Sequence, residues 1–391
     1  MRSEGSAPQE VLRVASELRR QGIDFVLLST PGNVTYAAGF EAPIQLGPIS
    51  DVVSGLPLAL ALVSADGAGQ VVSADAYVKA AAQSWFAELT PYDSLGHFEE
   101  LDPPGSLRSA LRSMLQAAGL GNGSCVLGVE ASLPRLVQEL LAVEFPQVEL
   151  RDAGPALEQA RMIKTEREVG LLRRAAQVAS AGQRRLCELA AGGATSGADI
   201  DLWIELLHTM ESEASRQLIV TGELVTGSRT AHIAPGGPVG RELQHGDTVL
   251  FDVSPRVEGY WADCTNTLVF AAEPTAEQRK YFDAARESCE AAMATLVPGA
   301  RCSDAAEAVR QTMERHGLRV AHYSGHEIGA SVNERPRLAP YDRSIVEPGM
   351  VFCVEPGAYA GDEGATGARA EKTVLVTDDG PEILSQFEWG F

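Results

Sequence analysis

Basic residues are scarce in this sequence. The 391 residues include 32 lysines and arginines against 53 aspartates and glutamates, which gives a formal net charge of −21. Nucleic-acid phosphates require Lys and Arg partners, and an anionic membrane surface attracts the same residue types. The shortage of positive charge therefore argues against nucleic acid and membrane surfaces as partners.

Long apolar runs are absent as well. No stretch approaches the ~18 consecutive apolar residues that would predict a membrane-spanning helix, and the opening MRSEGSAPQE lacks the pattern of a signal peptide. These features predict a cytoplasmic protein. The length allows about two domains, with enough apolar residues to bury separate cores.

Paired cysteine motifs are missing too. The six cysteines occur singly, without a Cys-x-x-Cys pair, at positions 125, 187, 264, 289, 302 and 353. This spacing indicates neither a zinc knuckle nor a disulfide framework, and we expect reduced thiols in the core. Cys264 and Cys353 lie near other candidate site residues, but strand alternation points at least Cys264 to the opposite face of its strand. A catalytic thiol is therefore not favoured.

A predicted hairpin supplies the first candidate site residues. The runs Thr248–Val253 and Tyr260–Phe270 have strand character and are joined by the turn-like segment SPRVEG. If the turn is centred on Val257–Glu258, Asp252 and Asp263 lie directly opposite each other, with Cβ atoms about 4.5–5.5 Å apart. Such a pair persists if one carboxyl is protonated or if cations lie between the two. A bulge would shift the register, and a turn aspartate paired with a solvated one is the alternative interpretation.

Three later residues extend this set. Glu355 ends the apolar run in GMVFCVEPGAY and is followed by a proline that cannot donate to a strand ladder. Glu371 begins the strand-like run TVLVT, with Arg369 two residues earlier on the same face, and His326 lies among glycines in YSGHEIGAS. An Arg–Glu ion pair and a core histidine are the alternative interpretations. Four carboxylates and one imidazole form an oxygen-dominated set that suits Mn, Fe or Co and tolerates Zn.

These residues carry a resemblance. The chain resembles the pita-bread metallopeptidase family that includes aminopeptidase P, prolidase, methionine aminopeptidase and creatinase. The similarity rests on the spacing of Asp252 and Asp263, on GHEIG around His326, on VEPGAY around Glu355 and on RAE around Glu371, in that order. Near the N-terminus, GIDFVLLSTPGNVTYAAGF resembles the opening of the creatinase and prolidase N-terminal domain, which methionine aminopeptidase lacks.

The resemblance implies a dinuclear metal site. Asp252 would chelate one ion, Asp263 and Glu371 would bridge both ions, and His326 and Glu355 would complete the second site. A hydroxide bridging the metals would be the nucleophile, and Glu355 or Glu371 would relay protons. Manganese is the expected ion, with iron, cobalt and zinc also compatible with these ligands.

The resemblance also implies a two-domain α/β architecture. Residues 1–157 would form a creatinase/prolidase-like N-terminal domain, residues 158–391 a pita-bread catalytic domain, and the protein would be a homodimer. In RMIKTEREVGLLRRAAQVAS, Thr165 and Glu168 fit a capping box at the start of a helix. Other expected elements, read from apolar periodicity, are helices at Pro8–Gln21, Ser106–Ala118, Leu133–Val143, Ala276–Leu296 and Ser303–His316, and strands at Phe25–Leu28 and Leu58–Ser64.

Candidate substrate contacts follow from the same comparison. His232, in GSRTAHIAPGGPVGRELQHGD, matches the family's substrate-side histidine, although a simple loop histidine is the alternative. Asn333 stands in GHEIGASVNERP where the family has a second histidine; an amide transfers no proton at neutral pH but can hydrogen-bond a carbonyl or an oxyanion. We expect His232, Asn333 and Arg369 to contact substrate. The remaining histidines, at 97, 208, 245, 316 and 322, have no motif context and are expected on the surface or in the core.

Two further positions depart from the family pattern. The usual Thr-Arg-Thr after the second aspartate becomes Thr-Asn-Thr at 265–267, and Lys372 follows Glu371 where an acidic residue is common. The metal ligands are therefore complete, while residues around them differ.

Three functions are compatible with these motifs. The first is a dinuclear Xaa-Pro peptidase of the aminopeptidase P or prolidase type, acting on short peptides. The second is hydrolysis of a non-peptide C–N bond in a small amino-acid derivative, as in ectoine-hydrolase-like or creatinase-like members. The third is a non-catalytic binding protein on the same scaffold, which the complete ligand set disfavours.

Overall fold

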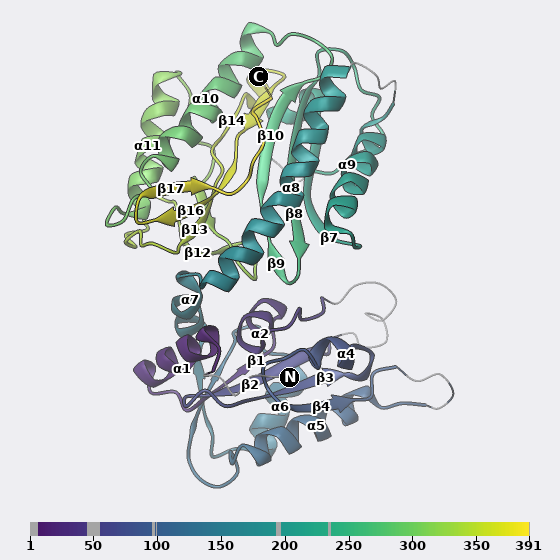
Figure 1. The fold of residues 1–391 in the computed structure, drawn as a ribbon, viewed down its shortest axis with the longest axis vertical. Helices are drawn as coiled ribbons and strands as arrows, with labels where there is room; N and C mark the ends of the chain where they lie inside the picture. Colours follow the sequence, from purple (N-terminus) through teal and green to yellow (C-terminus); the bar gives the residue numbers. More distant parts are fainter. Residues whose placement is uncertain are drawn as a thin grey trace. The chain divides into compact units, whose positions relative to one another are not determined.

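The structure is a computed structural model that describes residues 7–44, 55–95, 98, 100–192, 197–233 and 236–390. His97 lies outside the described residues. The chain divides into two compact units, Met1–Arg161 and Met162–Phe391, whose elements are labelled in Figure 1. The predicted boundary between residues 157 and 158 falls within helix α7 (Gly154–Met162). None of the helices in the described ranges combines the length and apolar character needed to cross a membrane.

The N-terminal unit is built on one mixed sheet in the order β4-β3-β2-β1-β5-β6. Strands β1, β2 and β3 pair antiparallel, while β4, β5 and β6 add in parallel. The strands are β1 (Phe25–Leu28), β2 (Ala59–Ser64), β3 (Gly69–Ala74), β4 (Glu88–Tyr92), β5 (Val126–Val129) and β6 (Glu149–Asp152). The helices are α1 (Gln9–Gln21), α2 (Pro31–Ala38), α4 (Val78–Ala81), α5 (Pro103–Ala117) and α6 (Arg135–Glu144), with a 3-10 turn at Asp75–Tyr77.

Apolar spacing explains why these helices form where the sequence predicts them. In α1, Val11, Val14 and Leu18 recur at intervals of three and four residues and are buried, which is the pattern of a helix with one face on a core. Gly22 ends the helix in the left-handed conformation, with φ 65°, as is common at helix C-termini. The predicted helices α1, α5 and α6 and the predicted strands β1 and β2 are confirmed.

The C-terminal unit contains two larger sheets and a two-stranded ribbon. Their orders are β10-β8-β7, with β9 paired to β8, then β12-β11-β13-β16-β17, and β14-β15. The strands are β7 (Ile219–Thr226), β8 (Thr248–Val257), β9 (Tyr260–Trp261), β10 (Cys264–Val269), β11 (Gly325–Glu327), β12 (Glu334–Arg337), β13 (Val351–Val354), β14 (Gly357–Tyr359), β15 (Gly367–Arg369), β16 (Lys372–Thr377) and β17 (Gly380–Ile383).

Among the described residues of this unit, four helices cover these sheets. Helices α8 (Glu166–Gly192) and α9 (Asp199–Ala214) pack on β7, β8 and β10, while α10 (Ala276–Met293) and α11 (Cys302–Arg315) pack together, with α10 against β13, β14 and β15 (Figure 1). Short 3-10 turns lie at Gly227–Ala231 and Gly361–Glu363. The two larger sheets meet where the backbone N–H of Glu371 donates to Thr265 O at 3.0 Å. This junction brings strands from both sheets to one site. The α/β fold predicted from the sequence is confirmed.

The predicted capping box at the start of α8 is present. The backbone N–H of Thr165 donates to Glu168 Oε2 at 2.9 Å, and the backbone N–H of Glu168 donates to Thr165 Oγ1 at 3.2 Å. Two amide groups that the helix cannot pair are therefore satisfied reciprocally.

Candidate metal centre

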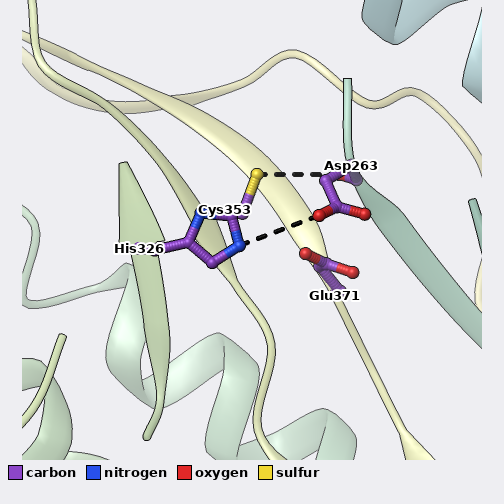
Figure 2. Close-up of side chains that lie close together, drawn as sticks. All are labelled: Asp263, His326, Cys353 and Glu371. Carbon is purple, nitrogen blue, oxygen red and sulfur yellow. Dashed lines mark hydrogen bonds and ion pairs between the residues drawn. The ribbon is translucent and has the colours of Figure 1, made fainter. Parts of the chain in front are cut away.

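Four buried side chains converge where the two sheets of the C-terminal unit meet. One ligand atom from each of Asp263, His326, Cys353 and Glu371 lies within 4.8 Å of the other three (Figure 2). Cross-strand pairing explains the arrangement, because His326 of β11 is the register partner of Cys353 in β13. Asp263 directly precedes β10 and Glu371 directly precedes β16. Residues 108 positions apart in the sequence thus become neighbours.

The other two predicted ligands belong to the same cluster. His326 Nε2 lies 3.7 Å from Asp263 Oδ2 and 3.5 Å from Glu355 Oε1. Asp252 is close enough to Asp263 and Glu371 to raise the pKa of both carboxyls. The structure therefore brings together all five predicted ligands.

The predicted hairpin register is wrong. Asp252 is the register partner of Thr265, two residues further along than Asp263. The turn is centred on Glu258 and Gly259, which both have positive φ angles of 51° and 88°, as a two-residue hairpin loop of the primed type requires. Asp263 instead accepts a hydrogen bond from Ser254 Oγ at 2.9 Å. A shift of two residues keeps side chains on the same face, so the two aspartates remain diagonal neighbours.

The clustered carboxyl groups disfavour each other's charged form. Burial raises the pKa of Asp263 and of Glu371 well above their usual values, and neighbouring carboxylates raise them further. Burial, opposed by Arg369, raises the pKa of Glu355 to about 8. Among the described residues, Asp252 Oδ1, Glu355 Oε1 and Glu371 Oε1 are buried without a hydrogen-bond donor. Buried acceptors of this kind are costly unless a cation satisfies them, so the residues fit divalent metal ions.

His326 presents the correct nitrogen for a metal. Its Nδ1 lies 2.8 Å from its neighbour's carbonyl oxygen, Glu327 O, and a carbonyl can only accept, so Nδ1 carries the proton. Nε2 is then the unprotonated nitrogen facing Asp263 and Glu355. Burial lowers the pKa of His326, which keeps the ring in the neutral form that binds metals.

Cys353 is a neutral thiol in this cluster. Burial, followed by the charges of Glu371 and Asp263, raises its pKa well above the usual value. Its Sγ lies 3.8 Å from the backbone oxygen Asp263 O. Since the thiolate is the form that attacks or binds metal, this environment argues against Cys353 as a nucleophile. Cys264 contacts Gln183 of α8 on the other side of the sheet, which confirms its predicted orientation.

A second layer of side chains fixes the carboxylates. Arg369 Nη2 donates to Asp252 Oδ2 at 2.8 Å and to Glu223 Oε2 at 2.7 Å. Thr265 Oγ1 donates to Glu371 Oε2 at 2.8 Å and accepts from Arg369 Nε at 3.2 Å. Arg369, expected to contact substrate, is thus bonded to protein carboxylates, and a substrate contact stays a prediction.

His232 and Asn333 occupy different surroundings. His232 is more than half exposed, and its Nε2 lies 3.8 Å from Asp362 Oδ1; within the described ranges, no hydrogen bond or ion pair joins it to the five ligands. Asn333 donates from Nδ2 to Tyr323 Oη at 3.0 Å and accepts from Arg337 Nη2 at 3.2 Å. Their substrate roles remain predictions.

An aromatic group beside the ligands was not predicted from the sequence. His322 Nε2 lies 3.4 Å from Tyr359 Oη, and the Tyr323 ring lies 6.2 Å from the His326 ring, centroid to centroid. Burial lowers the pKa of His322 to about 4. In the sequence, His322 stands four residues before His326. This spacing would predict a shared face only in a helix, and the segment is not helical.

The two other departures from the family pattern lie away from the ligands. Lys372 Nζ donates to Phe387 O at 2.6 Å and lies 3.1 Å from the centroid of the Phe387 ring. Asn266 donates to Glu388 O at 3.1 Å and accepts from the backbone N–H of Gly390 at 3.1 Å. Both residues hold the segment 385–390 against the back of the sheet, because alternation points them away from Glu371 and Thr265.

Comparison with known proteins shows the family of the chain. The family model of metallopeptidase family M24 matches residues 170–378, more than half of the chain. The chain belongs to metallopeptidase family M24. A second model, the Creatinase/Prolidase N-terminal domain, matches residues 11–163 of this M24 protein. The family resemblance drawn from the sequence motifs is confirmed.

Individual relatives are similar over most of the M24 protein. A probable dipeptidase PepE of Mycobacterium tuberculosis is 30% identical over 269 residues, covering 68% of this chain and 69% of the relative. A Xaa-Pro dipeptidase of Pyrococcus horikoshii is 25% identical over 264 residues, covering 67% and 73%. The prolidase structure from Pyrococcus horikoshii superposes with a TM-score of 0.78 at 21% identity, covering 98% of this chain and 99% of that one. This structural likeness shows a shared fold.

Proposed function

We propose that this M24 protein is a dinuclear metal-dependent peptidase that hydrolyses the bond before proline in Xaa-Pro dipeptides. One observation carries the proposal: three buried carboxylate oxygens, on Asp252, Glu355 and Glu371, converge on one site without a hydrogen-bond donor among the described residues. The Xaa-Pro dipeptidase named among the relatives supports the choice of substrate.

The five converging residues would hold two divalent ions. Asp252, Asp263, His326, Glu355 and Glu371 supply one nitrogen and several carboxylate oxygens, a donor set compatible with manganese, iron, cobalt and zinc; manganese is our expectation. Bound there, the ions would polarise the scissile carbonyl and lower the pKa of water towards neutrality.

The chain's own residues then have distinct tasks. Glu355 or Glu371 would carry the proton from the attacking water to the leaving proline nitrogen. His232, on the loop after β7, would position the peptide. Arg369 would hold Asp252 in place through its 2.8 Å hydrogen bond. In the resembled family, the N-terminal domain restricts the site to short substrates, and we expect the same here.

Two further parts of the proposal concern the whole protein. We expect a homodimer, as the resembled family forms, and a cytoplasmic location. Light scattering on the purified protein would test the first, because a monomer mass would contradict it.

A second function is favoured by one observation. Asn333 occupies the position of the second family histidine and is bonded to Tyr323 and Arg337, so proton transfer by that residue is lost. Hydrolysis of a small non-peptide amide would be compatible with such a change.

Turnover of a panel of short peptides distinguishes the Xaa-Pro peptidase from the hydrolase of a small non-peptide amide. Manganese-loaded protein would be incubated with Xaa-Pro dipeptides and tripeptides, with matched Xaa-Ala peptides and a chelator-treated sample as controls. Chelator-sensitive cleavage limited to Xaa-Pro peptides, read by mass spectrometry, is the expected result. Metal binding without cleavage of any peptide would contradict the peptidase and favour the small amide.

A further inference from the structure

Cys353 shares one face of its sheet with two of the proposed metal ligands. It is the register partner of His326 across the β11–β13 pair, and directly paired residues project from the same face of an antiparallel sheet. Glu355 follows two residues later on the same side. Ligand atoms of four side chains, within 4.8 Å of one another, form what we call the thiol cluster: Asp263, His326, Cys353 and Glu371 (Figure 2).

The thiol cluster needs only a small contraction to hold one ion. Bonds of about 2.0–2.3 Å in a tetrahedral zinc site place the ligand atoms roughly 3.3–3.8 Å apart. His326 Nε2 and Asp263 Oδ2 are already 3.7 Å apart, and the 4.8 Å limit of the cluster exceeds the tetrahedral spacing by about 1 Å. Small side-chain rotations therefore close the set around one ion. Its nitrogen, two carboxylate oxygens and sulfur are all donors that Zn²⁺ accepts.

The sulfur of Cys353 is only loosely held by the protein. Its contacts to Asp263 O and to Thr373 Oγ1 are long, at 3.8 Å and 3.9 Å, and a thiol is a weak hydrogen-bond donor. Burial and the neighbouring carboxylates keep the thiol protonated without a cation, but a metal ion deprotonates a thiol that coordinates it. Formation of the metal–sulfur bond thus breaks only these weak contacts and releases the thiol proton to solvent.

We propose that Cys353 is an additional metal ligand that thiophilic divalent ions such as Zn²⁺ recruit, and that such an ion binds singly to the thiol cluster. Thiolate ligands favour zinc, whereas manganese prefers carboxylate oxygens. The inference rests on the metal site of the proposed function and is independent of its substrate.

A single ion in the thiol cluster excludes the dinuclear arrangement. It takes Asp263 and Glu371, the two carboxylates that would bridge the pair of ions in the proposed function. Four protein ligands also complete a tetrahedral shell, whereas a catalytic zinc site keeps one position open for water or substrate. The thiol of Cys353 therefore makes the centre respond differently to zinc and to manganese.

Cobalt(II), a spectroscopic substitute for Zn²⁺, tests the sulfur ligand directly. Chelator-stripped protein would receive one equivalent of Co²⁺, and the thiolate-to-metal charge-transfer band would be sought in the near-ultraviolet spectrum. We expect the band in wild type and in Cys302→Ser, and its absence in Cys353→Ser. Cys302 is the matched control, because it is as fully buried as Cys353 but begins α11, outside the thiol cluster. A wild type without the band, whether or not Co²⁺ binds, would overturn the proposal.

Metal affinities provide a second, independent measurement. Cys353→Ser should bind Zn²⁺ at least about 10-fold more weakly than wild type, because loss of even a hydrogen bond to a metal ligand typically weakens binding about 10- to 100-fold. Its affinity for Mn²⁺ should be unchanged, which also shows that the variant is folded. Equal Zn²⁺ affinities of the two proteins would overturn the proposal.

Failure of the proposed function gives a different result. A wild type that shows the cobalt–thiolate band but cleaves no Xaa-Pro peptide with manganese would contradict the peptidase and support the role of Cys353. Chelator-sensitive cleavage by a wild type without the band would support the peptidase and overturn the role of Cys353.

Discussion

Lys164 and Glu327 form an ion pair in which both side chains are fully buried, with Nζ 2.9 Å from Oε2. Glu334 lies 3.4 Å from the same ammonium. Glu327 directly follows His326 in β11, and its carbonyl oxygen accepts from His326 Nδ1. The pair therefore ties the strand that carries the histidine to the segment just before α8.

Removing one partner of this pair should be strongly destabilising. Lys164→Met leaves Glu327 buried without its cation, which typically costs about 3–5 kcal/mol. Combining Lys164→Met with Glu327→Gln also removes the unpaired buried carboxylate, so the double variant should recover part of the lost free energy of unfolding. Urea unfolding of metal-free protein measures both, and a double variant as unstable as the single one would contradict this explanation.

Arg369 should matter for metal affinity through Asp252. Arg369→Gln removes the 2.8 Å hydrogen bond that orients this carboxylate, and loss of such outer contacts typically weakens metal binding about 10- to 100-fold. Glu223→Gln is the matched control, because it alters the other partner of Arg369 and leaves the bond to Asp252. Calorimetric titration with Mn²⁺ measures the metal affinity of the wild type and of both variants. Equal affinities for wild type and Arg369→Gln would exclude an orienting role.

His322 should make the stability of the metal-free protein pH-dependent. Burial lowers its pKa to about 4 in the folded state, against about 6.5 in the unfolded chain. The unfolded state therefore binds more protons between these values, so stability is complete above pH 6.5 and falls as the pH decreases towards 4. The loss is at most about 3 kcal/mol.

His322→Gln provides the test, because glutamine does not titrate. The difference in unfolding free energy between wild type and variant, measured in urea at several values between pH 4 and pH 7, should shift against the wild type as the pH falls. A difference that is constant across this range would mean that His322 is not held neutral.

Lys372 and Asn266 should anchor the segment 385–390 without affecting the metals. Lys372→Met removes a charged hydrogen bond to Phe387 O, and contacts of this type are typically worth about 1.5–3 kcal/mol. Amide hydrogen exchange in the segment should accelerate, while Mn²⁺ content stays unchanged. Asn266→Ala should act in the same direction. Loss of metal from either variant would contradict the separation of the two faces of the sheet.

The closeness of the five candidate ligands could be expected from the sequence because each lies in or beside a β-strand within a distinctive local motif. Asp263, His326 and Glu371 each stand next to residues whose apolar or glycine-rich pattern is inconsistent with an exposed charge. The register of the hairpin could not be predicted, because it depends on the positive φ angles of Glu258 and Gly259. Either of two adjacent turns fits the letters SPRVEG.

Contacts across irregular segments explain the other omissions. Tyr323 reaches Asn333 only through the cross-strand pairing of β11 with β12, which includes a register shift after His326. Cys353 joins the cluster because β13 pairs with β11 in one register. Neither strand pairing can be predicted from one sequence, because no repeating pattern of residues links the paired segments.

Metal stoichiometry tests the central claim most directly. Chelator-stripped wild type would be titrated with Mn²⁺ in a calorimeter, beside Asp263→Ala and the control Cys353→Ser. The control changes a residue of the cluster that is not one of the five proposed ligands. We predict two ions per wild-type chain, two for Cys353→Ser and none for Asp263→Ala. Wild-type binding of both ions by Asp263→Ala, or no binding by the wild type, would contradict the dinuclear site.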